Sequence, residues 1–332
     1  MKRQQNVSDI PLIAMIIAFP HVHPNRLIAR LTILRCQLGL MPFPVIRNAS
    51  KQHAQLAVLP EYHLLNWVPQ DPKFKEACSQ WETYLNKYID LAKECNINIV
   101  PGTIIELHDA GTEKERLLNV AYFITNTGEI AGKYVKKNLW GSIERLHLTS
   151  SSRDPHPVFE TPLGKVGMLI CWDLAFPEAF REMIAQGAKM IIIPTFWTLS
   201  DCSPAGLAIN PVAEGLFLDS MLTARCYENT CGKLSTQTRT STRKQCDPDL
   251  VVAAIVFANA GGPPGKGYAG LSQVVVPYAG PLVRLGSHAE GMAVVDLDMQ
   301  IVEDAEENYQ VRADLARGDW HYDYRHNQDA KL

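Results

Sequence analysis

A cysteine lies where an apolar strand is expected to meet the start of a helix. The run Val166-Gly-Met-Leu-Ile ends on Cys171, and Pro177, which suits the first turn of a helix, follows shortly after. This pattern puts the sulfur at the carboxyl end of a strand, beside the N–H groups of a turn and near a helix N-terminus. Such groups favour a thiolate and stabilise an oxyanion. We therefore interpret Cys171 as a nucleophile, the alternative being an ordinary buried thiol.

A cysteine nucleophile needs a base. The ten histidines show no spacing that singles one of them out. A carboxylate is the other choice, and Glu61 follows a second apolar run, Leu56-Ala-Val-Leu-Pro. A glutamate at the end of a buried strand is either a base or one half of a structural salt bridge.

A cluster of lysines supplies the positive charge that such a site would use. Lys133, Lys136 and Lys137 occur in the segment that begins Gly132-Lys-Tyr-Val-Lys-Lys-Asn-Leu-Trp. Lysines in a run normally cover a solvated face, and two of these three are expected to do so.

The three segments together resemble the signature motifs of the nitrilase superfamily, the carbon-nitrogen hydrolases. Those motifs are a strand ending in Pro-Glu, then Gly-x-Tyr-x-Lys-x-x-Leu, then a strand ending in Cys before an aromatic residue, an acidic residue and Phe-Pro-Glu. The resemblance implies that Glu61 is the base, Lys136 the triad lysine, Cys171 the nucleophile and Glu144 a second glutamate at the site. It covers roughly residues 48–315.

The resemblance also implies the reaction. Sulfur would add to an amide or ureido carbon, ammonia or an amine would leave, and water would hydrolyse the acyl-thioester, with no metal or other cofactor. The sequence Cys171-Trp172-Asp173 before Phe-Pro-Glu is similar to the amidase and N-carbamoyl amidohydrolase branches, so the expected partner is a small amide or N-carbamoyl compound. Two alternatives stay open: a true nitrilase acting on nitriles, and an inactive member that serves as a binding subunit.

Four aromatic residues next to or just after these motifs are candidates for the substrate pocket. They are Tyr62, Trp140, Trp172 and Trp197. The alternative is that one or two of them pack the core.

Short apolar runs that end in Pro or Gly alternate with helical patterns. The expected strands cover 56–59, 97–100, 119–124, 165–170, 190–193, 251–258, 272–276 and 292–297, and the expected helices cover 74–91, 177–187 and 212–227. The alternation predicts an α/β protein. The resemblance implies a four-layer αββα sandwich that forms a homodimer or a larger homo-oligomer.

Composition narrows the class of protein. The 332 residues carry a formal net charge of -3, so no overall charge draws the chain to nucleic acid or to an anionic membrane. The eight cysteines form no Cys-x-x-Cys pair, and no apolar run reaches the roughly 20 residues that cross a bilayer. We expect a cytoplasmic protein.

One domain, 1–332, is expected, with two atypical segments. Residues 10–19 read as an opening strand, but 20–44 lack the amphipathic helix that should follow, so 1–47 fit the family poorly. Residues 232–249 are polar and basic without apolar periodicity, and we interpret them as an exposed insertion loop. Contact with RNA or a membrane is less favoured, since no aromatic residue is interleaved to stack on a base.

Overall fold

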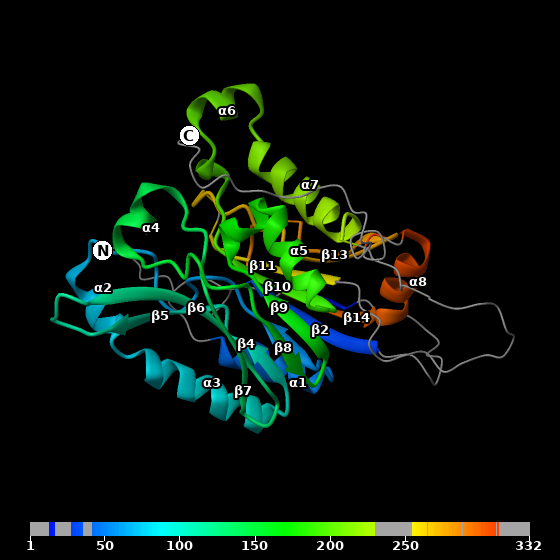
Figure 1. The fold of residues 1–332 in the computed structure, drawn as a ribbon, viewed down its shortest axis with the longest axis horizontal. Helices are drawn as coiled ribbons and strands as arrows, with labels where there is room; N and C mark the ends of the chain where they lie inside the picture. Colours follow the sequence, from blue (N-terminus) through cyan, green and yellow to red (C-terminus); the bar gives the residue numbers. More distant parts are fainter. Residues whose placement is uncertain are drawn as a thin grey trace, which may run out of the picture.

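The computed structural model describes residues 13–16, 28–35, 42–229, 254–263, 265–286, 288–309 and 311. Two β-sheets lie face to face, and helices cover their outer surfaces (Figure 1). This arrangement is the four-layer αββα sandwich that the resemblance implies.

The first sheet has eight strands in the order β1-β14-β2-β3-β4-β6-β5, with β7 also paired to β6. Its strands are β1 (Ile13–Ile16), β2 (Ile28–Arg35), β3 (Leu56–Val58), β4 (Asn98–Val100), β5 (Thr103–His108), β6 (Arg116–Ile124), β7 (Ile130–Val135) and β14 (Gly291–Asp298). The pairs β2-β3 and β3-β4 are parallel, so these strands end at the same edge of the sheet.

The second sheet has six strands in the order β13-β12-β11-β10-β9-β8. Its strands are β8 (Val158–Thr161), β9 (Gly164–Met168), β10 (Met190–Thr195), β11 (Ala254–Asn259), β12 (Gln273–Val276) and β13 (Gly280–Arg284). All six residues of β10 are buried, as expected for a central strand that is covered on both faces.

The core follows the alternation of side chains along each strand. In β3, Leu56 and Val58 pack between the two sheets, while Ala57 points to the outer face under α1 (Phe43–Lys51) and α3 (Trp81–Cys95). The six-stranded sheet packs its outer face against α5 (Pro177–Ala185) and α7 (Ala213–Tyr227). Figure 1 shows α3 on one side of the sheets and α7 on the other.

The remaining helices are short or peripheral. They are α2 (Pro72–Cys78), α4 (Gly141–His147), α6 (Pro204–Ile209), α8 (Met299–Tyr309) and the 3-10 turns η1 (Cys171–Ala175) and η2 (Leu199–Asp201). No helix in the described part of the chain is long and apolar enough to cross a membrane.

Some expectations need correction. The single helix expected over 74–91 is two helices, because the hydroxyl of Ser79 donates to the Glu76 carbonyl and closes α2. Part of the opening strand expected over 10–19 is present as β1 at the sheet edge, and β2 is a strand that the sequence did not predict. A helix that the sequence did not predict, α1, begins at Phe43, at the end of the 20–44 segment. The predicted insertion loop, 232–249, lies outside the described residues.

Candidate active site

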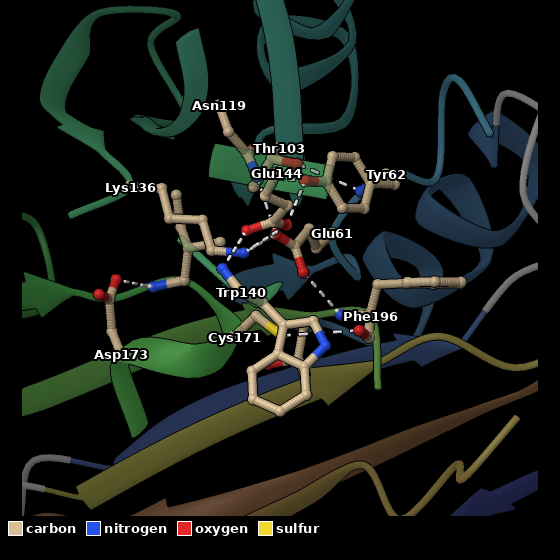
Figure 2. A network of polar contacts seen from close by, with 12 residues as sticks. Glu61, Tyr62, Thr103, Asn119, Lys136, Trp140, Glu144, Cys171, Asp173 and Phe196 are labelled. Carbon is tan, nitrogen blue, oxygen red and sulfur yellow. Dashed lines mark hydrogen bonds and ion pairs between the residues drawn. The ribbon is translucent and has the colours of Figure 1, made fainter. Parts of the chain in front are cut away.

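Three strand ends meet between the sheets. Glu61 follows β3 and Lys136 follows β7 of the eight-stranded sheet, whereas Cys171 follows β9 of the six-stranded sheet. Figure 2 shows the side chains of Glu61, Lys136 and Glu144 converging beside Cys171. The structure therefore brings together the four residues that the sequence singles out for chemistry.

The Lys136 ammonium lies between two carboxylates. Its Nζ is 2.9 Å from Oε1 of Glu61 and 2.8 Å from Oε1 of Glu144. Lys136 and Glu61 are fully buried, and Glu144 is 5% exposed. The remaining contacts of Glu61 are fixed donors: Asn119 Nδ2 at 2.8 Å to Oε1 and the Phe196 N–H at 2.9 Å to Oε2.

Glu144 is held as firmly as Glu61. Its Oε1 also accepts from the Tyr62 hydroxyl at 2.6 Å, and its Oε2 accepts from the N–H of Trp140 at 2.6 Å. Through the second contact, Glu144 accepts a hydrogen bond from the backbone N–H at the N-cap of its own helix, α4.

Burial and charge set the protonation of the cluster. Burial raises the pKa of Glu61 to about 7 despite the opposing charge of Lys136, and the charge of Glu144 adds to the rise. Burial alone would lower the pKa of Lys136, but the two carboxylates outweigh it and raise that pKa. Lys136 is therefore a permanent cation, and Glu61 can gain or lose a proton near neutral pH.

Cys171 occupies a strained turn. Its φ is 50°, in the left-handed region that disfavours residues with a Cβ, and strain of this kind costs about 1–3 kcal/mol. The thiol is 6% exposed, and its Sγ lies 3.5 Å from the Phe196 carbonyl oxygen. Phe196 thus contacts Cys171 through its carbonyl and Glu61 through its N–H.

The surroundings of Cys171 favour the protonated thiol. Burial raises the pKa of Cys171 well above its usual range, the charge of Glu61 raises it further, and Lys136 lowers it by less. This direction opposes the thiolate character expected from the sequence, because desolvation outweighs the attraction to Lys136. The site therefore needs a base.

Asp173 ties the lysine segment to the cysteine turn. Its Oδ1 accepts from the backbone and side-chain N–H groups of Asn138 at 2.9 and 2.8 Å, and its Oδ2 accepts from Tyr134 at 2.8 Å and from the Ile170 N–H at 2.9 Å. Four donors thus hold one buried carboxylate, and they fix the spacing between Lys136 and Cys171.

The backbone before Glu61 passes unusually close to Gly102. A Cβ at Gly102 would lie 1.9 Å from the Pro60 carbonyl oxygen, and the φ of Gly102 is +60°. Only glycine fits at this position without displacing the end of the strand that carries Glu61.

A cavity of about 320 Å³ opens at Cys171. Its lining residues are Tyr62, Trp67, Trp140, Gly141, Ser142, Ile143, Glu144, Cys171, Phe196 and Asp201. Tyr62 and Trp140, both expected in the pocket, are among them.

The other two expected pocket residues line a narrower recess that also reaches Cys171. Trp172 packs against Trp140 with ring centroids 4.3 Å apart, and Trp197 lies 5.6 Å from Trp172. Trp197 is only 3% exposed, and its Nε1 donates to Glu214 at 2.6 Å, so this residue also belongs to the core.

Several site residues were missed from the sequence. Asn119 is a polar residue within an expected apolar strand, a signal that was available. Phe196 acts through its backbone, which no residue type reveals. Asp201 ends the short 3-10 turn η2 and Trp67 lies in a loop, and the motifs determine the folding of neither segment.

No group of three or more His, Cys, Asp and Glu side chains within the described ranges could hold a metal ion.

Comparison with known proteins identifies relatives. The family model described as carbon-nitrogen hydrolase matches residues 44–307. A probable nitrilase of Schizosaccharomyces pombe is 28% identical over 225 residues, which cover 66% of this chain and 66% of the relative. The 2-oxoglutaramate amidase of Bacillus subtilis is 27% identical over 278 residues, covering 82% of this chain and 88% of the relative. The chain spans about two thirds or less of the length of the first curated relatives that it matches.

Solved structures share the fold. A carbon-nitrogen hydrolase from Helicobacter pylori G27 aligns with a TM-score of 0.69 over 86% of this chain and 95% of that chain, at 20% identity. The fold, the order of the three motifs and the family match agree, and the chain belongs to the carbon-nitrogen hydrolase family of the nitrilase superfamily.

Proposed function

We propose that this chain hydrolyses non-peptide carbon-nitrogen bonds in amides or N-carbamoyl compounds, with Cys171 as nucleophile, Glu61 as general base and Lys136 as the stabilising cation. The main support is the enclosed cluster in which Lys136 contacts both Glu61 and Glu144 beside a buried thiol. Family membership and the amidase name of one relative agree with this proposal.

Attack begins with the neutral thiol. Ionised Glu61 takes the proton of Cys171 as sulfur adds to the substrate carbon, a role for which its pKa of about 7 is well placed. The thiol proton leaves the Phe196 carbonyl, while the Phe196 N–H keeps Oε2 of Glu61 close by. Small rearrangements of this kind are common when a substrate enters an empty site.

The tetrahedral intermediate carries a negative oxygen. The Lys136 ammonium and the Trp172 N–H, which lies in the first turn of η1, are the proposed donors to it. One good donor of this type lowers the activation barrier by about 3–4 kcal/mol. Glu144 and Asn119 contact Lys136 and Glu61, and hold these two groups in place.

Collapse of the intermediate breaks the carbon-nitrogen bond. Protonated Glu61 returns its proton to the leaving nitrogen, and ammonia or an amine departs, leaving an acyl-thioester on Cys171. Glu61 then takes a proton from water as the water attacks the thioester, and returns that proton to the departing sulfur, which releases the acid product and restores the free thiol. All steps use groups of this chain.

A nitrile is the second candidate substrate, because one relative is named a probable nitrilase. The same nucleophile could add to a cyano carbon. An inactive binding subunit is a weaker candidate, because the residues needed for catalysis are assembled. Lys136 contacts both Glu61 and Glu144, and the charges of all three act on Cys171.

The direct test is ammonia release from a panel of aliphatic amides, ω-amides, N-carbamoyl amino acids and nitriles. Wild type should release ammonia from at least one amide or N-carbamoyl compound, and Cys171→Ala should lose at least about 10³-fold of that rate. Cys202→Ala, at a half-buried cysteine outside the cluster, is the matched control. Activity on nitriles alone would favour the second candidate, and no activity from folded protein would favour the binding subunit.

We also expect a cytoplasmic homodimer or larger homo-oligomer. Exposed apolar side chains at Ile209 of α6, at Val212 just before α7 and at Leu216 of α7 are consistent with association through the outer helices. Sedimentation of the purified chain tests the assembly state.

A further inference from the structure

The walls of the cavity beside Cys171 are aromatic. Tyr62 and Trp67 stack with ring centroids 5.0 Å apart, and Phe196 meets Tyr62 edge-on at 6.0 Å. Trp140, 37% exposed, forms the wall next to Trp172. The face of an aromatic ring carries partial negative charge and attracts a cation that lies over it.

The charged side chains that line the described part of the cavity are acidic. Glu144 and Asp201 both line it, and none of its described lining residues is Lys, Arg or His. Lys136 lies behind the lining, fully buried and already shared by two carboxylates. A substrate carboxylate would therefore lose its hydration and meet acidic groups with no free cation to pair with.

Asp201 has capacity to bind a further donor. Each of its oxygens accepts one hydrogen bond from Thr198, from the N–H to Oδ2 at 2.8 Å and from the hydroxyl to Oδ1 at 2.9 Å. A carboxylate oxygen has two acceptor sites, so one remains on each. The contacts from Thr198 fix this carboxylate at the cavity wall, although the reaction itself does not require it.

We propose that the substrate is an amide whose acyl chain carries an ammonium group, which Asp201 binds through a charge-assisted hydrogen bond among the rings of Trp67, Trp140 and Phe196. This inference rests on the proposed function, because it assigns the substrate class of the same site. It sets the chain apart from the Bacillus subtilis relative, whose named substrate, 2-oxoglutaramate, carries a carboxylate.

Three primary amides of similar length test the assignment at neutral pH: 4-aminobutanamide (cationic), pentanamide (neutral) and succinamate (anionic). We expect kcat/KM to be highest for the cation, about tenfold above the neutral amide, and lowest for the anion. Asp201→Asn keeps one oxygen acceptor for Thr198 and should reduce the ratio of cation to neutral amide about tenfold. Asp90→Asn, exposed on α3, is the charge control and should leave that ratio as in wild type.

Failure of this inference differs from failure of the proposed function. Equal kcat/KM values for the three amides, or a preference for succinamate, would overturn the substrate class while the hydrolase stands. An equal loss on all three amides in Asp201→Asn would reduce Asp201 to a structural role and also overturn it. If no amide is hydrolysed, calorimetric Kd values of the three amides with Cys171→Ala still decide the inference: tighter binding of the cation supports it, and equal or reversed affinities overturn it.

Discussion

Two glutamate-lysine pairs occupy the same sheet, and only one of them lies at the candidate site. Glu61 pairs with Lys136, directly after β7, and Glu106 on β5 pairs with Lys133 on β7. Both glutamates are fully buried. The two pairs differ in the exposure of the lysine and in the number of carboxylates that the lysine contacts.

Lys133 is a surface residue. Its side chain is 41% exposed and lies over the rings of Trp81 and Tyr122, while Glu106 also accepts from His108 at 2.7 Å and from the Tyr122 hydroxyl. One carboxylate thus has three donors. This pair joins β5 and β7 across the intervening strand β6 and contacts α3 through Trp81, which is a structural role.

Lys136 is enclosed, and two carboxylates share it. Water cannot screen the excess negative charge, so the proton affinity of Glu61 rises until its pKa is about 7. Two features thus distinguish Glu61 from a residue of a structural ion pair: its lysine is enclosed, and a second carboxylate shares that lysine. Together they bring the pKa of Glu61 near neutral pH. The comparison makes four predictions.

The largest expected effect separates the two glutamates. Glu61→Gln removes the proposed base and should lower kcat/KM for a neutral amide about 10²–10⁴-fold. Glu106→Gln should leave kcat/KM within about threefold but lower the free energy of unfolding by about 1–3 kcal/mol, because buried donors lose an acceptor. Steady-state kinetics and urea unfolding measure both. Similar kinetic losses in the two variants would contradict the distinction.

The second largest effect should distinguish the two lysines. Lys136→Met should lower kcat about 10²–10³-fold by removing the oxyanion donor, and should destabilise the fold by about 3–5 kcal/mol because two buried carboxylates lose their cation. Lys133→Met removes a half-exposed partner and should cost about 1 kcal/mol or less. A folded Lys136→Met variant with wild-type kcat would exclude Lys136 from the mechanism.

The third prediction concerns pH. Protonated Glu61 cannot act as a base, so kcat/KM for a neutral amide should fall as pH falls through about 7. The negative charge of Glu144 contributes to the raised pKa of Glu61, and Glu144→Gln should therefore move the profile to lower pH. Glu106→Gln is the control and should not move it. An unmoved profile in Glu144→Gln would show that the two carboxylates are not coupled.

The smallest effects should come from the two tyrosines. Tyr62→Phe removes a hydrogen bond to Glu144 and should lower kcat about fivefold, which corresponds to about 1 kcal/mol. Tyr122→Phe removes the matching bond to Glu106 and should change stability by a similar amount without a kinetic effect. Parallel measurement of kcat and thermal unfolding distinguishes the two outcomes.

The sequence was sufficient to identify Lys136 as the site lysine among the three lysines of its segment. Side chains alternate along a strand, so Tyr134 and Lys136 share the inward face of this segment while Lys133 and Val135 share the other. The motif and this alternation both select Lys136, and the structure buries it while Lys133 is exposed.

Other features depend on tertiary contacts that the sequence does not display. The strands with apolar runs were predictable, but α1 buries only Ile46 and Ala49, too few positions for a periodic pattern. The protonated state of Cys171 depends on burial between two sheets, which local motifs do not encode. Asp201 reaches the cavity from the short 3-10 turn η2, so its spacing from Cys171 carries no signal.

The central claim is that Cys171 carries the acyl group during hydrolysis. Acid quenching of the enzyme during turnover of a neutral amide, followed by mass spectrometry of the digested protein, tests it directly. We predict an added acyl mass on the peptide that contains Cys171, with none in Cys171→Ala. Steady ammonia release without such an adduct, together with a Cys171→Ala variant that retains wild-type kcat, would contradict it.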